Sequence, residues 1–222
     1  MRTLVLLCLT VASLVVGTTA SEIFDKELIN KVQQTYGDQA VLRTKAWQTL
    51  VTDNQHLPDE EKLHLVNAFF NQLHFVDDLV LWGQEDYWAT PIEMIGSNAG
   101  DCEDFTIAKY FTLRELGIDD DKLRLIYVKA LNLNQFHMVL AYYPRPGDDP
   151  LLLDNLDPEI KDASKRQDLF PVYSFNGSRL WLLKERGREI LAGKSSRLSL
   201  WNDVKSRIRS SKMKKAIVNY NG

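Results

Sequence analysis

Residues 99–117, AGDCEDFTIAKYFTLRELG, predict a helix that begins at Cys102 and ends at Gly117. Asp101 stands just before this helix and can cap it, while Gly117 provides the glycine that commonly ends one. Apolar residues recur on several faces of the predicted helix, so we expect it to be mostly buried. Because this helix begins with a cysteine, we expect the residue that carries the chemistry to lie at the start of a central element of the fold.

Segments with helical spacing come before this helix. Apolar residues recur every three to four positions in 22–36 and 40–51, and Pro58 begins a third segment that ends near Leu73. Between 82 and 99, a proline and a glycine interrupt any period, so this segment is expected to be irregular. The N-terminal part of the chain is therefore predicted to be mainly helical.

The apolar period changes to two after the central helix, which indicates β-strands. Asn176-Gly177 is the strongest turn signal in the chain and predicts a hairpin. A closing helix is expected over 205–218. Helices followed by antiparallel strands place the chain in the α+β class. The expected strands cover 123–130, 136–143, 151–154, 170–175 and 179–183.

The N-terminus has the features of a removable secretion signal. Arg2 is followed by an apolar run over 4–16, which is short for a membrane span, and by small residues that end at Ala20. We expect cleavage after Ala20, which leaves residues 21–222 as one exported, soluble domain. An uncleaved membrane anchor is the alternative. No later segment is long and apolar enough to cross a membrane.

Charge is distributed unevenly along the chain. From Lys184 to the C-terminus there are eleven Lys or Arg residues and three Asp or Glu residues, whereas the whole chain has a net charge of −3. A solvated amphipathic helix explains this basic region, and anionic lipid headgroups or an acidic partner are the alternatives. Nucleic acid is not expected as a partner, because an exported protein rarely meets it.

Three residues in different predicted elements suggest nucleophilic catalysis. Cys102 is the only thiol outside the predicted signal, which contains Cys8, so it cannot close an internal disulfide. His137 lies in an apolar strand, and Asp154 ends the next strand close to the position opposite His137. Cysteine, histidine and aspartate in this arrangement can act as nucleophile, base and orienting carboxylate. Alternatively, Cys102 is a small buried residue and His137 is a core side chain.

The position of Cys102 at a helix start favours its thiolate form. Backbone N–H groups are unpaired at this end of a helix, and the helix dipole there stabilises a negative sulfur. The same N–H groups can stabilise the oxyanion of an acyl intermediate. The predicted helix therefore supplies part of the chemistry as well as part of the core.

Acidic neighbours oppose that thiolate. Asp101, Glu103 and Asp104 flank Cys102, and one unit charge about 7 Å away costs about 2.4 kcal/mol at an effective dielectric of about 20. A divalent cation such as calcium would remove this cost, because carboxylates suit a hard ion. Capping of the helix by the same carboxylates is the simpler alternative, and the spacing alone leaves both open.

Four segments together resemble a known family. They are Ala99 to Phe105 around Cys102, the helix end Glu115-Leu116-Gly117, the strand around His137-Met138-Val139, and Leu153-Asp154-Asn155-Leu156. These segments resemble the bacterial transglutaminase-like cysteine proteinases, and the resemblance runs over most of residues 21–222. It implies a papain-like or transglutaminase-like fold, with the cysteine-bearing helix packed on an antiparallel sheet. It also implies that Cys102, His137 and Asp154 form the catalytic triad.

The resemblance further implies a metal, a substrate, a location and a regulator. Family members depend on calcium, and the acidic residues beside their nucleophile correspond to Asp101 and Glu103 here. The implied substrate is the N-terminal region of a large biofilm adhesin, cut in the periplasm next to paired small residues such as Ala-Ala. The implied regulator is the periplasmic domain of an inner-membrane receptor for cyclic di-GMP, which sequesters the protease.

Two other functions are compatible with the same fold. A transglutaminase-like acyltransferase would pass the acyl group to an amine instead of water, and incorporation of a labelled amine would reveal it. A non-catalytic binding module would have a Cys102 thiol no more reactive than an ordinary thiol. We expect the calcium-dependent cysteine endopeptidase in preference to both.

Overall fold

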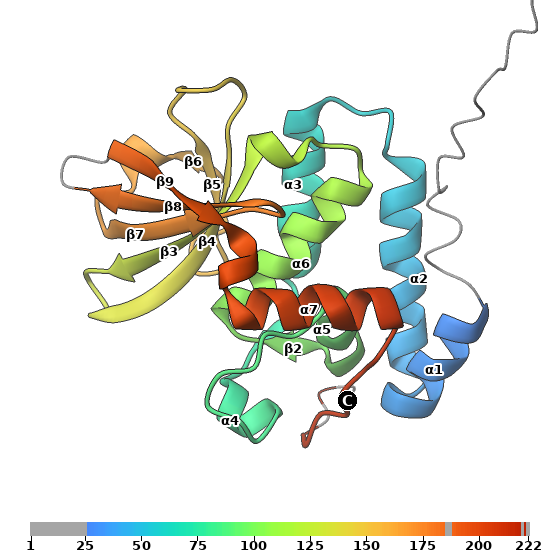
Figure 1. Ribbon diagram of the computed structural model, residues 1–222. Helices are drawn as coiled ribbons and strands as arrows, with labels where there is room; N and C mark the ends of the chain where they lie inside the picture. Colours follow the sequence, from blue (N-terminus) through green and yellow to red (C-terminus); the bar gives the residue numbers. More distant parts are fainter. Residues whose placement is uncertain (1–25, 185–187, 219, 221–222) are drawn as a thin grey trace, which may run out of the picture.

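The computed structural model describes residues 26–184, 188–218 and 220 (Figure 1). The predicted secretion signal at 1–20, with its Cys8, lies outside the described residues. Within the described part, no helix combines the length and the hydropathy that a membrane crossing requires.

The three helices predicted before the irregular segment are all present, and α1 lies beside α2 (Figure 1). Gly37 separates the first two with a φ of 89°, a left-handed conformation that glycine adopts without strain. Trp47 ties the second helix to the central one, because its indole N–H donates to Thr112 Oγ1 at 2.8 Å. The three are α1 (Lys26–Tyr36), α2 (Asp38–Asp53) and α3 (Asp59–Phe70).

Part of the segment predicted to be irregular is helical. Thr90 caps α5 (Pro91–Ser97): its hydroxyl accepts from the Glu93 N–H at 3.3 Å, and the Glu93 carboxylate accepts from the Thr90 N–H at 2.7 Å. Pro91 occupies the first helical position, where no N–H is needed, so the proline that suggested a break instead begins a helix. Nearby are α4 (Asp78–Leu81) and a parallel pair, β1 (His74–Phe75) and β2 (Ala99–Gly100).

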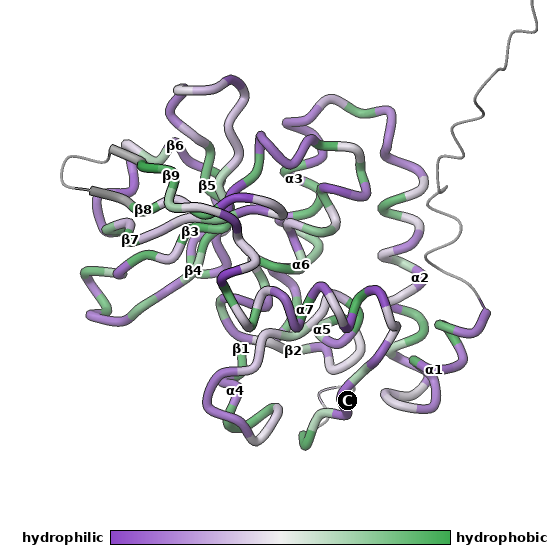
Figure 2. The backbone as a smooth tube through the Cα atoms, viewed as in Figure 1, coloured by the Kyte–Doolittle hydropathy of each residue, from purple (hydrophilic) through white to green (hydrophobic). Residues whose placement is uncertain are grey.

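The central helix, α6 (Cys102–Glu115), begins at the predicted residue. It is largely buried, as expected, and packs against α3 and α5 on one side and against β3 and β4 on the other. Gly117 follows it with a φ of 90°, which provides the predicted glycine stop. Hydrophobic segments of α6, β4 and β5 meet at the centre of the molecule (Figure 2), so α6 organises the main core.

Seven strands form one antiparallel sheet in the order β6-β5-β4-β3-β7-β8-β9. The predicted hairpin is confirmed, and the Asn176 side chain shapes its turn by accepting from the N–H groups of Ser178 and Arg179. All five predicted strands are present, whereas β6 and β9 were not predicted. The α+β class is therefore confirmed. The strands are β3 (Leu123–Ala130), β4 (Gln135–Tyr142), β5 (Leu151–Leu153), β6 (Lys161–Asp162), β7 (Leu169–Phe175), β8 (Arg179–Lys184) and β9 (Arg188–Lys194).

The closing helix, α7 (Ser199–Ser210), begins and ends earlier than the predicted 205–218. Trp201 and Val204 anchor it because both are fully buried. Ser211 then has a φ of 49°, which ends the helix. The segment that follows contacts α4, because the Ile217 N–H donates to the Leu81 carbonyl at 2.8 Å. Backbone partners on other elements therefore replace the expected last helical turns.

Candidate active site

Cys102 lies at the start of α6, where this helix meets the unpaired edge of β4. β4 pairs with β5 only through residues 140–142, so the backbone of Met138 is free to contact α6. The Met138 N–H donates to the Cys102 sulfur, and its carbonyl accepts from Thr106 Oγ1 at 2.9 Å. The structure thereby places the sulfur next to the strand residue that follows His137.

The Cys102 thiol is half-buried and strongly held in its protonated form. Burial raises its pKa most, and the charges of Glu103 and Asp101 raise it further. The thiol donates to Glu103 Oε2 across 2.9 Å, which also favours the proton. The Met138 N–H opposes these effects but does not overcome them. The acidic neighbours therefore have the effect expected from the sequence.

His137 and Asp154 form a buried pair. Asp154 follows β5 immediately, and the register that pairs Leu140 with Leu153 puts it one diagonal step from His137. His137 Nε2 lies 2.7 Å from Asp154 Oδ1, and the exposed fractions of the two side chains are 4% and 0%. Within the described residues, no hydrogen bond joins Cys102 directly to His137. The structure thus brings all three predicted residues to one region and pairs two of them.

Arg166 holds the other side of Asp154 and was not predicted. Its guanidinium donates to Asp154 Oδ2 at 2.9 Å and to the Asp168 carboxylate at 2.8 and 3.0 Å. Burial alone would raise the pKa of Asp154, but donation from His137, from the Leu156 N–H and from Arg166 lowers it to about 2. Asp154 is therefore a permanent carboxylate at any ordinary pH.

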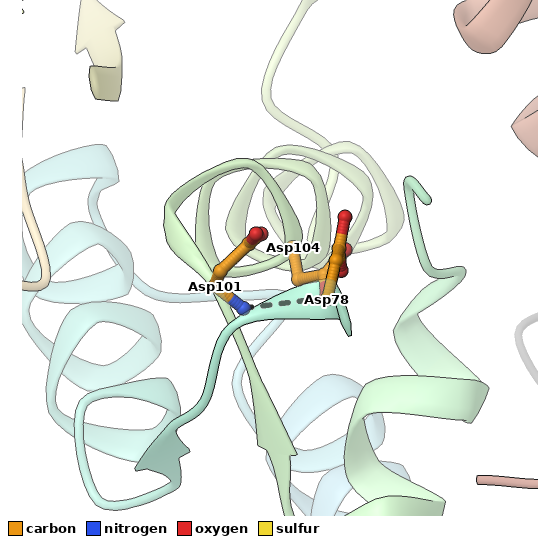
Figure 3. Close-up of side chains that lie close together, drawn as sticks. All are labelled: Asp78, Asp101 and Asp104. Atoms are coloured by element: carbon orange, nitrogen blue, oxygen red, sulfur yellow. Dashed lines mark hydrogen bonds between the residues drawn. The ribbon is translucent and has the colours of Figure 1, made fainter. Parts of the chain in front are cut away.

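A cluster of carboxylates lies beside the nucleophile. Asp78 of α4 comes within 4.8 Å of Asp101 and Asp104 (Figure 3), and also of Asp86 and Glu103. Burial and the neighbouring charges raise the pKa of Asp78 to about 7, and burial together with the charges of Asp104 and Glu103 raises that of Asp101 well above its usual range. The cluster therefore contains more negative charge than the described residues neutralise.

Some oxygens in this cluster lack partners. Asp78 Oδ1 and Asp101 Oδ1 are buried, and neither has a hydrogen-bond partner within the described residues. Asp104 is better satisfied, since it accepts from the Ala89 N–H at 2.6 Å and from the Asp101 N–H at 3.4 Å. Unpartnered buried carboxylate oxygens need compensation, and hard cations provide it. The donor set therefore fits calcium, and it includes the predicted Asp101 and Glu103.

Close packing fixes the cluster at the helix start. A Cβ on Gly100 would lie 2.7 Å from Asp104 Cβ and 2.8 Å from Asp104 Oδ2, so only glycine fits there. Asp78 and Asp86 were missed because they precede α6 by many residues in a segment without a clear period. Asp104 was recognised as an acidic neighbour of Cys102, but the resemblance implied only Asp101 and Glu103 as ligands.

Comparisons with known proteins show the family and the fold of this chain. Residues 29–174 match the family described as "Bacterial transglutaminase-like cysteine proteinase BTLCP". An EGTA-treated structure of Legionella pneumophila LapG is 41% identical, covers 86% of this chain and 97% of its own, and superposes with a TM-score of 0.74. A calcium-bound structure of the same protein is 41% identical, covers 86% and 99%, and has a TM-score of 0.71. The comparison with curated protein sequences gives no match. The fold is that of a transglutaminase-like cysteine protease.

Proposed function

The chain belongs to the bacterial transglutaminase-like cysteine proteinases, and we therefore propose that it is a calcium-dependent periplasmic cysteine endopeptidase. The observation that carries the proposal is the buried pair of His137 and Asp154. His137 directly precedes Met138 on β4, and the Met138 backbone contacts the Cys102 sulfur. We assign residues 21–222 to one catalytic domain behind a cleavable signal.

In the proposed reaction, Cys102 attacks the scissile carbonyl carbon of a protein substrate. His137 Nε2 is engaged by Asp154, so Nδ1 is the nitrogen available to take the thiol proton. A sulfur–carbon bond forms, the carbon–nitrogen bond breaks, and His137 gives the proton to the departing amine. Water activated by His137 then hydrolyses the thioester and regenerates the thiol. The first N–H groups of α6, including that of Cys102, are suited to stabilise the oxyanion in both steps.

Asp154 acts by orienting His137 and stabilising its charged form. A carboxylate with a pKa of about 2 remains ionised, so it favours the imidazolium that forms when Cys102 loses its proton. Arg166 positions Asp154 from behind through Oδ2, which leaves Oδ1 directed at His137. Arg166 is therefore a positioning residue for the same reaction.

We assign a calcium site to the carboxylate cluster, with Asp101 and Glu103 as ligands and Asp78, Asp86 and Asp104 as further candidates. When bound, calcium supplies positive charge that offsets the carboxylates opposing the thiolate and competes with the thiol for Glu103. The calcium-bound and EGTA-treated structures of Legionella pneumophila LapG support this assignment. Without such compensation, Glu103 accepts a hydrogen bond from the thiol, which keeps the proton on the Cys102 sulfur and makes it unreactive.

We propose the substrate and the regulator from the family resemblance. The substrate is the N-terminal region of a large cell-surface biofilm adhesin, which cleavage next to paired small residues releases. The regulator is the periplasmic domain of an inner-membrane cyclic di-GMP receptor, which sequesters the enzyme.

Incubation with purified N-terminal fragments of large secreted adhesins tests this proposal. Wild-type protein with calcium should yield two fragments, whereas Cys102→Ala protein and EGTA-treated wild-type protein should yield none. A labelled amine added in parallel detects acyl transfer. Incorporation of the amine without peptide cleavage would replace the protease proposal with an acyltransferase.

A further inference from the structure

One half of the inner face of the sheet lies beyond the helices. On the face that packs against α6, Leu125, Leu140 and Phe175 are fully buried. Two residues further along their strands, a second row crosses five strands, and in Figure 1 these strand ends extend away from the helices. The members of this second row, called the apolar row below, are Met138, Tyr127, Tyr173, Leu182 and Ile190, each the direct cross-strand partner of the next.

The members of the apolar row that lie farthest from α6 are exposed to solvent. Leu182 of β8 is 51% exposed and Ile190 of β9 is 40% exposed. Phe136, on the same face of β4, is 58% exposed. Soluble proteins seldom leave a contiguous apolar strip of this kind without a partner. The exposed side chains therefore indicate a contact surface.

Stacked rings make the part of the row near α6 flat and rigid. The centroids of Phe136 and Tyr127 lie 5.1 Å apart with an interplanar angle of 16°. Those of Tyr127 and Tyr173 lie 5.0 Å apart at 22°. Such offset stacks hold their rings in fixed orientations. A ligand on this surface therefore meets a preformed platform.

The apolar row begins at the nucleophile. Its first member, Met138, donates its N–H to the Cys102 sulfur. Its second member, Tyr127, is the direct cross-strand partner of Met138, so its ring lies next to Met138 on the same face of the sheet. A chain bound along the row would therefore have one end at the reacting sulfur.

Along most of the apolar row, a bound peptide can contact the side chains of the sheet but cannot pair with its backbone. β3, β7 and β8 each pair with neighbours on both sides, so their backbones have no free edge to which a peptide strand could add. Aromatic faces and aliphatic side chains bind apolar residues through buried area, with little dependence on an exact sequence. The surface thus suits an apolar segment of a protein chain.

We propose that the apolar row is a substrate-docking surface, on which an apolar segment of the protein substrate lies on one side of the bond cut at Cys102. The inference rests on the proposed protease function and adds a specificity determinant to it. Four strand spacings of about 4.8 Å give the row a length of about 19 Å, which an extended peptide covers with about six residues. Recognition should therefore extend about six residues from the scissile bond.

Two neighbouring residues of β9 provide a matched test. Ile190 belongs to the apolar row, whereas Leu191 is 58% exposed and pairs with Trp181 on the opposite face of the sheet. Ile190→Asn and Leu191→Asn remove similar apolar area at exposed sites, so both proteins should fold. Leu182→Asn provides a second change within the row.

The assay compares one short and two long quenched fluorescent peptides with calcium present. The short peptide has two residues on each side of an Ala-Ala pair, and long peptides add six apolar residues on one side or the other. Wild type should prefer one long peptide in kcat/KM. Ile190→Asn and Leu182→Asn should each lower that preference about threefold to tenfold, and Leu191→Asn should keep it. Equal preferences in Ile190→Asn and Leu191→Asn would overturn the proposal.

Binding separates this inference from the protease function. In Cys102→Ala protein, fluorescence anisotropy with the long peptide should give a Kd that Ile190→Asn raises and Leu191→Asn does not. Retained binding with no cleavage by wild type would refute the protease function but keep the docking surface. If the row variants bind the long peptide normally but lose the receptor's periplasmic domain, the surface serves a regulator and the proposal is wrong.

Discussion

Replacement of Arg166 by methionine tests whether a buried cation sets the state of Asp154. The side chain of Arg166 is 8% exposed, and it donates to an Asp154 side chain that is 0% exposed. Arg166→Met leaves Asp154 Oδ2 without this partner in a water-poor site. Breaking a buried pair in this way costs about 3–5 kcal/mol, and the value should be near the lower limit because Oδ1 keeps its bonds to His137 and the Leu156 N–H.

Thermal unfolding followed by circular dichroism measures this cost. For a chain of this size, about 3 kcal/mol corresponds to a Tm lower by about 6–12 °C. Because the folded-state pKa of Asp154 is lowered from 3.8 to about 2, its contribution to stability is present above about pH 4 and is lost as the pH falls toward 2. In Arg166→Met protein this acid transition should move to higher pH, because the carboxylate loses a group that favours its charge.

Activity provides the second measurement for the same variant. Loss of a partner that orients a catalytic carboxylate typically lowers activity about 10- to 100-fold. Asp168→Asn is the matched control, because it removes a partly exposed contact of Arg166 and leaves the bond to Asp154 in place. A wild-type Tm and a wild-type cleavage rate in Arg166→Met protein would refute the role of Arg166.

Three further outcomes concern the carboxylate cluster. Calcium at 100 times its Kd should stabilise wild type by about 2.7 kcal/mol and raise its Tm accordingly. Asp78→Asn and Glu103→Gln should reduce this rise in Tm, whereas the distant Asp121→Asn should keep it. Calorimetry with calcium titration measures the rise. In EGTA, wild type should lose up to about 4 kcal/mol of stability as the pH rises from about 4 to 7. The reason is that Asp78, with a pKa of about 7 in the folded protein, keeps a proton that the unfolded chain releases. In urea unfolding, the stability of Asp78→Asn protein should depend less on pH. Gly100→Ala should destabilise the protein by about 1–3 kcal/mol in urea unfolding, because the added Cβ would overlap the Asp104 side chain.

The sequence predicts well those elements that interactions between neighbouring residues determine. The buried helix α6, its glycine stop and the strands β3 and β4 are all present in the structure. Pro91 was misread because a proline can either break a helix or begin one, and the capping pair of Thr90 and Glu93 decides between these outcomes. The end of α7 depends on a backbone bond from Ile217 to α4, which no local pattern contains.

The candidate site divides in the same way. Cys102, His137 and Asp154 were predicted because their residue types and order fit one chemistry, and the structure pairs two of them and places the third nearby. Arg166 and Asp78 were not predicted, since each reaches the site from a segment whose path only the tertiary fold determines. Local spacing cannot identify such partners.

Alkylation of the single thiol in residues 21–222 tests the central claim most directly. Iodoacetamide labelling of Cys102, followed by intact-mass measurement at pH 7 with calcium, should be at least about tenfold faster than labelling of a cysteine in an unstructured peptide. EGTA treatment should slow it, since Glu103 and Asp101 then raise the pKa of the thiol without compensation. His137→Ala should also slow it to the rate of the peptide or below. Equal labelling rates for wild-type and His137→Ala protein in calcium would contradict activation of Cys102 by His137.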